Sequence, residues 1–220
     1  MAPTYLCRFP GSHSDGLRGS ALLLMSDATE TEQTKAALRA EALARRDALP
    51  AAERQAAAEA IAARAFPIAV STGSIVAGFS PMRSEINPVP LMRKLAGAGA
   101  QLALPVVQGR GKPLIMRAWH FGAPLKSGQW GIREPTADAA EVAPDILIVP
   151  LAAFDRQGHR IGYGAGYYDM TIHALRAKKK VIAVGIAYAA QEIEQVPATE
   201  RDARLDLVLT ERETIDFRKV

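Results

Sequence analysis

Cysteine is nearly absent from this chain: its 220 residues include one, Cys7. A single thiol excludes a disulfide framework and a cysteine metal cluster, and its place in a weakly patterned stretch argues against a nucleophilic role. A reducing compartment, the cytoplasm, is therefore expected. The four histidines also lack the spacing of a metal site or a catalytic triad. They are His13, His120, His159 and His173.

Long hydrophobic runs and strong charge of one sign are missing as well. The longest apolar run near the start covers residues 21–25, far fewer than the roughly 20 residues of a membrane-spanning helix. The 27 Lys and Arg residues against 23 Asp and Glu leave a net charge of only +4, and aromatic residues make up 6%. Nucleic-acid surfaces combine clustered cations with stacking aromatics, so neither nucleic acid nor a membrane is an expected partner. The mild positive charge suits polyanionic small-molecule substrates.

The rest of the composition, 49% hydrophobic and 23% charged, is that of a soluble globular protein. Residues 1–30 contain several Pro, Gly and Ser residues with little periodicity, and we predict that they form a disordered extension. A transit peptide and a translation start at Met25 are alternatives. Residues 31–220 are long enough for a single domain with its own core, which we expect to be a monomer.

Helical and strand patterns alternate along this domain. Helical spacing predicts helices over residues 31–49, 51–66, 88–98 and 167–177. Short apolar runs predict strands over residues 75–79, 102–107, 146–149, 181–186 and 205–209, with an edge strand over 114–119. Because the strands are continuously apolar and separated by helices, we expect an α/β fold: a three-layer sandwich with a mainly parallel sheet. Ligands of such folds bind beyond the carboxyl ends of the strands.

A glycine-rich segment lies between a buried strand and an amphipathic helix. Gly162, Gly164 and Gly166 alternate there. Glycine permits positive φ and close approach of backbone amides to an anion, and the start of the helix adds favourable partial charge. We predict a phosphate-binding loop, with Arg160 as a fixed cation and Asp169 placed to hold Mg²⁺. The alternative is a turn without a ligand, in which Asp169 only stabilises the helix start.

The spacing excludes two common nucleotide loops. A dinucleotide G-x-G-x-x-G would need glycine where Tyr167 stands, and residues 109–113 lack the length and the Ser/Thr of a Walker A loop. Instead, residues 149–169 resemble the signature of the 5-formyltetrahydrofolate cyclo-ligase family. Further segments resemble that family in the same order: Lys35 with Leu38 and Arg39, Ser84-Glu85, residues 104–107, residues 130–135, and Asp202 with Leu205-Asp206 and Thr210-Glu211.

The resemblance implies a fold like the NagB/RpiA/CoA-transferase group. It also implies an enzyme that uses ATP and Mg²⁺ to convert 5-formyltetrahydrofolate to 5,10-methenyltetrahydrofolate, releasing ADP and phosphate. The ATP-binding residues that it implies are Lys35, Arg39, Arg160, Ile161, Gly162, Tyr163, Gly164, Ala165 and Gly166. The implied catalytic residues are Arg160, Tyr168 and Asp169, the metal ligands Asp169 and Asp202, and the folate-binding residues Phe79, Glu85, Trp130 and Tyr167.

Some of these residues have simpler interpretations. Lys35 and Arg39 are four apart on a helix, which is also typical of a solvated face. Glu85 could pair with Arg83, and Asp202 with a neighbouring arginine. Trp130 could be a core residue, and the tyrosines packing residues.

The middle position of the glycine loop also departs from the family pattern. Glycine or lysine is frequent there, and Ala165 fits the loop if its φ is negative. Two other functions stay open: a related ATP-dependent ligase or kinase acting on another pterin or a sugar phosphate, and a non-catalytic regulator that binds folate or a nucleotide.

Overall fold

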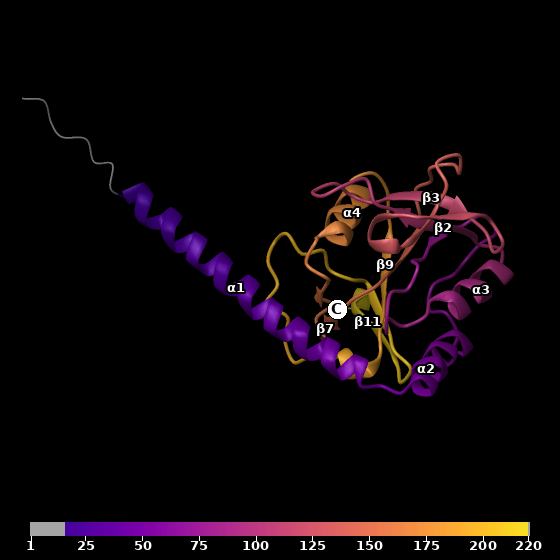
Figure 1. The fold of residues 1–220 in the computed structure, drawn as a ribbon, viewed down its shortest axis with the longest axis horizontal. Coiled ribbons are helices and arrows are strands. Elements are labelled where there is room, and N and C mark those ends of the chain that lie inside the picture. Colours follow the sequence, from indigo (N-terminus) through magenta and orange to yellow (C-terminus); the bar gives the residue numbers. More distant parts are fainter. Residues whose placement is uncertain (1–15, 220) are drawn as a thin grey trace, which may run out of the picture.

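The computed structural model describes residues 16–219, with side chains over residues 30–218. The described part has four α-helices: α1 (Gly16–Asp47), α2 (Ala51–Ala63), α3 (Val89–Gly97) and α4 (Tyr167–Arg176). It also has three short 3-10 helices: η1 (Gln129–Gly131), η2 (Ala189–Gln191) and η3 (Phe217–Lys219). Figure 1 shows the helices arranged around a central sheet, with α1 running beside β7.

The central sheet has seven strands. Their spatial order is β11 (Thr214–Asp216), β10 (Leu207–Leu209), β9 (Ile182–Ile186), β6 (Ile146–Val149), β1 (Ile75–Ala77), β2 (Gln101–Val106) and β3 (Ile115–Trp119). The inner five strands are parallel, and β11 and β3 pair antiparallel at the two edges. Two small hairpins lie outside this sheet: β4 (Leu125–Ser127) with β5 (Arg133–Pro135), and β7 (Ala153–Phe154) with β8 (Arg160–Ile161).

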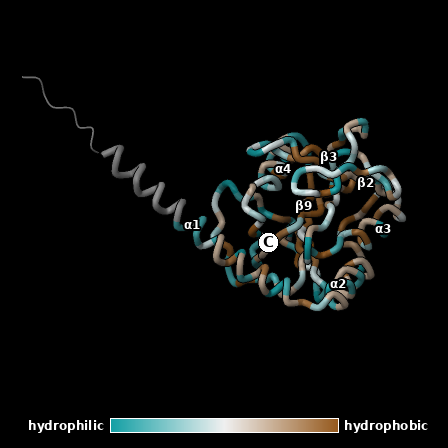
Figure 2. The backbone as a smooth tube through the Cα atoms, in the orientation of Figure 1, coloured by the Kyte–Doolittle hydropathy of each residue, from teal (hydrophilic) through white to brown (hydrophobic). Residues whose placement is uncertain are grey.

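Successive residues of a strand point to opposite faces of the sheet. Because the central strands are apolar throughout, both faces are hydrophobic and helices cover both. On β6, Ile148 belongs to a hydrophobic cluster with Leu91 of α3 and Ile61 of α2. Its neighbour Leu147 belongs to a second cluster, with Ile172 of α4. The most hydrophobic residues accordingly lie in the central strands (Figure 2). The predicted three-layer α/β architecture with a mainly parallel sheet is confirmed.

The elements differ from the sequence predictions mainly at their ends and in the smallest strands. Each predicted helix and strand has a counterpart, including the edge strand, whereas the hairpins β4–β5 and β7–β8 and the strand β11 were not predicted. Strands of two or three residues are too short to show a period. No helix in the described part of the chain combines the length and apolar character required to cross a bilayer.

Helix α1 begins earlier than predicted. Its backbone is helical from Gly16, so residues 16–30 are not the irregular extension that their Gly and Ser content suggested. The Ala and Leu residues at 21–24 favour a helix, and helical backbone bonds need no partner elsewhere in the chain. Residues 1–15 lie outside the described residues, and the domain boundary at residue 30 stays a prediction.

The strand order reverses next to β1. The chain passes from β1 through α3 to β2 on one side, whereas β6, β9 and β10 lie on the other side of β1. At such a point the loops that follow neighbouring parallel strands turn away from each other and leave a crevice at the carboxyl edge of the sheet. The topology therefore predicts a ligand site beyond the ends of β1, β2 and β6.

Candidate active site

A cavity of about 310 Å³ lies at this carboxyl edge. Phe79 follows β1, Val107 follows β2 and Pro150 follows β6, and all three line the cavity. Ten further predicted site residues line it as well: Glu85, Trp130, Arg160, Gly162, Tyr163, Ala165, Gly166, Tyr167, Tyr168 and Asp169. Most of the residues singled out from the sequence therefore meet in one place, although many lie far apart along the chain. Five of them do not line the cavity: Lys35, Arg39, Ile161, Gly164 and Asp202.

The glycine loop adopts an alternating backbone conformation. Gly164 has φ +95° and Gly166 has φ +67°, whereas Ala165 between them does not have a positive φ. Alternation of this kind turns successive amide N–H groups towards one side, which makes a concave binding site for anions. None of the amides of residues 163–166 donates a hydrogen bond to another described residue. The condition set for Ala165 is thus met, and the loop has donors to offer a ligand.

Arg160 and Asp169 form the charged part of the cavity wall. Arg160 Nη2 donates to Asp169 Oδ1 over 2.9 Å, and the backbone amide of Ala203 donates to the same oxygen over 3.0 Å. The Arg160 side chain is only 3% exposed, and within the described part of the chain its Nε has no hydrogen-bond partner. The Arg160 guanidinium is therefore a fixed cation in the cavity wall, held by its bond to Asp169.

Helix α1 supports the glycine loop from outside the cavity. Arg39 Nε donates to the carbonyl oxygen of Gly162 over 2.7 Å. Lys35 is 5% exposed, and its Nζ lies 2.6 Å from Asp202 Oδ2. The interpretation of Lys35 as part of a solvated face is therefore wrong. Neither cation lines the cavity, so each reaches a nucleotide only at its outer end.

Asp202 is tied into its own turn rather than paired with a neighbouring arginine. Its Oδ2 accepts hydrogen bonds from the amide and the hydroxyl of Thr199 as well as from Lys35. Burial by itself raises the pKa of this carboxyl, but the bonds from Lys35 and Thr199 outweigh burial and hold its pKa below the ordinary value. The other nearby carboxylate, Asp206, accepts from Arg176 and from the amide of Ala183.

The donors suit a metal ion that is shared with phosphate oxygens. No group of three or more His, Cys, Asp or Glu side chains among the described residues could hold a metal by itself. Magnesium in phosphate sites usually keeps one or two carboxylates, the remaining ligands being phosphate oxygens and water. Asp169, which lies in the cavity wall, fits that arrangement, whereas Asp202 does not line the cavity and its Oδ2 is bonded to Lys35 and Thr199.

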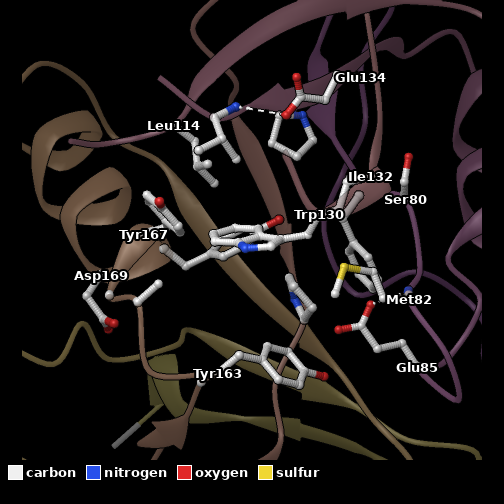
Figure 3. Close-up of a pocket in the computed structure, with 18 of the residues that line it drawn as sticks. Ser80, Met82, Glu85, Leu114, Trp130, Ile132, Glu134, Tyr163, Tyr167 and Asp169 are labelled. Atoms are coloured by element: carbon white, nitrogen blue, oxygen red, sulfur yellow. Dashed lines mark hydrogen bonds between the residues drawn. The ribbon is translucent and has the colours of Figure 1, made fainter. Parts of the chain in front are cut away.

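The opposite wall of the cavity is aromatic and carries one carboxyl. Figure 3 shows Glu85 and Met82 across the cavity from Asp169 and Tyr167, with Trp130 between them. The Trp130 side chain is 61% exposed, so it is not a core residue, and its ring centroid lies 6.0 Å from that of Tyr167. An exposed indole beside a second ring offers a planar ligand a stacking surface.

Glu85 does not pair with Arg83 as the simpler interpretation had it. Its Oε2 accepts from the backbone amide of Met82 over 2.7 Å, and no described arginine forms an ion pair with it. Burial raises the pKa of Glu85, and the bond from Met82 opposes that shift only partly. The Tyr163 hydroxyl and the positive charge of Arg46 oppose the shift as well, without cancelling it.

The remaining predicted residues contribute in different ways. The Ile161 side chain is 1% exposed and packs in a small core, so only its backbone is available to a nucleotide. Burial also raises the pKa values of Tyr163 and Tyr168 well above the ordinary range, which keeps both phenols protonated. Tyr168 is therefore a hydrogen-bond donor within the cavity wall rather than a base.

Two charged residues near the cavity received no role from the sequence. Arg46 is 3% exposed; its Nε donates to Ser84 Oγ over 2.9 Å and its Nη1 to the Tyr163 hydroxyl over 2.7 Å. Glu134, also 3% exposed, lines the cavity and accepts from the amide of Val107. The sequence around Arg46 does not distinguish it from the other charged residues of α1, because its two partners, Ser84 and Tyr163, lie in distant loops.

A mainly parallel sheet with a cavity at the carboxyl edge of its strands, lined by a glycine loop and by aromatic side chains, is typical of α/β enzymes. The family assignment agrees with this class. Residues 31–211 match the model of the 5-formyltetrahydrofolate cyclo-ligase family, so the chain belongs to that family of enzymes.

Known proteins resemble the chain over most of its length. A 5-formyltetrahydrofolate cyclo-ligase of Mycolicibacterium smegmatis is 34% identical over 83% of this chain and 96% of its own. That of Escherichia coli K12 is 36% identical over 61% of this chain and 76% of its own. The solved structure of Aquifex aeolicus 5,10-methenyltetrahydrofolate synthetase aligns with a TM-score of 0.68 at 30% identity, over 84% of this chain and 93% of the other. The Mycoplasma pneumoniae synthetase shares the fold, with a TM-score of 0.64 at 22% identity over 80% and 98%.

Proposed function

We propose that this protein catalyses the ATP- and Mg²⁺-dependent conversion of 5-formyltetrahydrofolate to 5,10-methenyltetrahydrofolate, with release of ADP and phosphate. The observation that carries the proposal is that the buried Arg160 lines the same cavity as Ala165 and Gly166 of the glycine loop, whose amides donate to no other described residue. A fixed cation beside free amide donors favours an anion. The aromatic wall with Glu85 supplies the place for a pterin.

The reaction needs activation because a formyl oxygen on nitrogen is a poor leaving group. The formyl oxygen takes the terminal phosphoryl group of ATP, ADP leaves, and N5 becomes part of an imino-phosphate. N10 then attacks the formyl carbon, which closes the five-membered ring, and N10 loses its proton. Departure of phosphate breaks the bond from this carbon to oxygen and leaves the N5–C–N10 amidinium of the methenyl product. The protein has to hold the two substrates in line and neutralise charge, which is the usual task in phosphoryl transfer.

The glycine loop and its cations would hold the nucleotide. In this proposal the backbone of residues 162–166 and Arg160 contact the phosphates, and Lys35 and Arg39 reach them from α1. Asp169 and Asp202 would hold the magnesium ion, which neutralises phosphate charge when bound. Asp169 also orients Arg160 through their direct bond.

The opposite wall would hold the folate. We propose that Trp130 and Tyr167 stack on the pterin, that Phe79 forms the apolar floor, and that Glu85 accepts a hydrogen bond from the pterin ring. Tyr168, kept protonated by its burial, would donate to an oxygen of the reacting groups. Together with Arg160 and Asp169 it forms the proposed catalytic set.

The direct test follows the absorbance of the methenyl product from 5-formyltetrahydrofolate, with and without ATP and Mg²⁺. We expect product only when both are present. Absence of product from folded protein would contradict the proposal: ATP hydrolysis that ignores folate would indicate a different ligase or kinase, and tight binding without turnover a regulator. We also propose that the protein is a cytoplasmic monomer. Size-exclusion chromatography with light scattering measures its molecular mass and so tests the monomer.

A further inference from the structure

A second hollow of about 500 Å³ opens beside the active-site cavity. The two share four lining residues: Ser80, Met82, Trp130 and Ile132. Figure 3 shows these residues on the side of the cavity that faces away from Asp169. A ligand whose reacting end lies near Asp169 can therefore extend past Trp130 into the second hollow.

Two arginines from different loops line this second hollow, and no acidic residue does. Arg83 comes from the loop after β1, and Arg133 from β5. Neither forms an ion pair with a carboxylate of the described residues. Arg133 Nη2 donates one hydrogen bond, to the carbonyl oxygen of Leu125 over 3.3 Å. The positive charge of Arg83 contributes slightly to the lowered pKa of Asp47. The hollow is thus lined by two arginines that no described carboxylate neutralises through an ion pair.

The backbone around the hollow is strained in two places. Arg83 has φ +52° and Trp130 has φ +57°, and they are the only described residues other than glycine with a positive φ. Both line this hollow, from opposite segments. Side-chain-bearing residues rarely hold such a conformation unless the surrounding structure enforces it, and sites of this kind cluster where ligands bind.

We propose that the second hollow is a carboxylate-binding subsite that takes the glutamate end of the folate substrate, with Arg83 and Arg133 as specificity-determining residues. The proposal rests on the function proposed above. Folates carry their carboxylates at the end remote from the pterin, and this polarity matches a site with the phosphates at one end and unpaired arginines at the other. A guanidinium pairs with a carboxylate through two parallel hydrogen bonds, which fixes both charge and orientation.

The test compares two substrates in four forms of the enzyme: the unmodified protein, two single variants and the double variant. The substrates are 5-formyltetrahydrofolate and its counterpart without glutamate, 5-formyltetrahydropteroate. The variants are Arg83→Asn, chosen because Asn tolerates a positive φ, and Arg133→Gln. For the complete substrate we expect KM to rise about 3- to 10-fold in each variant, and further in the double variant, with kcat unchanged, because the contacts act on ground state and transition state alike. For the truncated substrate KM should be the same in all forms.

A matched control separates the subsite from a general loss of positive charge. Arg212→Ala also removes one cation, from a side chain that is 79% exposed and does not line either hollow, and it should leave both KM values unchanged. Equal KM values for the complete substrate in wild type and variants, or an equal rise with the truncated one, would overturn the subsite alone. No turnover of either substrate by the unmodified enzyme would overturn the proposed function and this inference with it.

Discussion

Asp169 has two tasks at the level of single residues. Its Oδ1 accepts from Arg160 and from the amide of Ala203, while its Oδ2 accepts from no other described residue. The first oxygen fixes the carboxylate, and the second is left free for the metal ion proposed above. A substitution that keeps the acceptor but removes the charge separates the two tasks.

We predict that Asp169→Asn lowers kcat by about 100-fold or more, because one charged group that stabilises the transition state is lost. The protein should stay folded, since the amide oxygen of Asn can still accept from Arg160 and Ala203. Steady-state kinetics at several Mg²⁺ concentrations, with circular dichroism as the folding control, measures both effects. Unchanged turnover would show that the metal assignment is wrong.

Glu85 gives a prediction about pH. Burial raises its pKa above the ordinary 4.5, so the folded protein binds this proton more tightly than the unfolded chain does. The charged carboxylate therefore destabilises the fold at neutral pH, and that penalty disappears as the pH falls through the raised pKa. Gln keeps an oxygen that can accept from Met82 without carrying a charge.

Glu85→Gln should consequently be more stable than wild type at pH 8, and the gain should vanish towards pH 4. Thermal unfolding of the two proteins across this range measures the difference. A gain of constant size at every pH would mean that the carboxyl of Glu85 is not responsible for it.

At the level of elements, the loop before α4 depends on its positive-φ glycines. An added Cβ at Gly164 would meet no atom closer than 3.9 Å, and one at Gly162 none closer than 3.5 Å, so neither position is crowded. They differ in backbone conformation, because only Gly164 has a positive φ. The pair therefore isolates backbone conformation from packing.

Gly164→Ala should raise KM for ATP by about fivefold or more, because a left-handed conformation costs a residue with a side chain about 1–2 kcal/mol. Gly162→Ala should change it much less. Initial rates at varied ATP concentration provide the comparison. Equal effects of the two substitutions would contradict the alternating conformation as the source of binding.

At the level of the whole molecule, α1 closes the site from outside. It contacts three distant segments: Lys35 bonds Asp202, Arg39 bonds Gly162, and Arg46 bonds both Ser84 and Tyr163. Arg46 is the most buried of these cations, and it joins the loop that carries Glu85 to the glycine loop.

We predict that Arg46→Met lowers the free energy of unfolding by about 2–4 kcal/mol, because it leaves two hydroxyl groups without their buried charged partner. Arg212, whose side chain is 79% exposed and, among the described residues, forms an ion pair only with its neighbour Glu211, serves as the control. Arg212→Met should cost about 0–1 kcal/mol. Urea denaturation of the two variants tests the difference, and equal losses would show that the burial of Arg46 is of no consequence.

The sequence by itself determined the features that depend on neighbouring residues. Apolar runs and helical spacing were sufficient for six of the seven strands of the central sheet, for the four α-helices and for the fold class. The alternating glycines were sufficient for the loop at 162–166. These are local patterns: hydrophobic periodicity and the wide φ range of glycine can both be recognised from a few neighbouring residues.

Only the tertiary structure decided which charges meet. Lys35 and Asp202 are 167 positions apart, and Arg46 and Tyr163 are 117 apart. The residues adjacent to each of them in the sequence do not indicate which distant side chain it contacts. The same holds for the second hollow, because Arg83 and Arg133 come together only where two loops converge. A side chain's partner depends on how distant segments pack, and packing is a property of the folded chain as a whole.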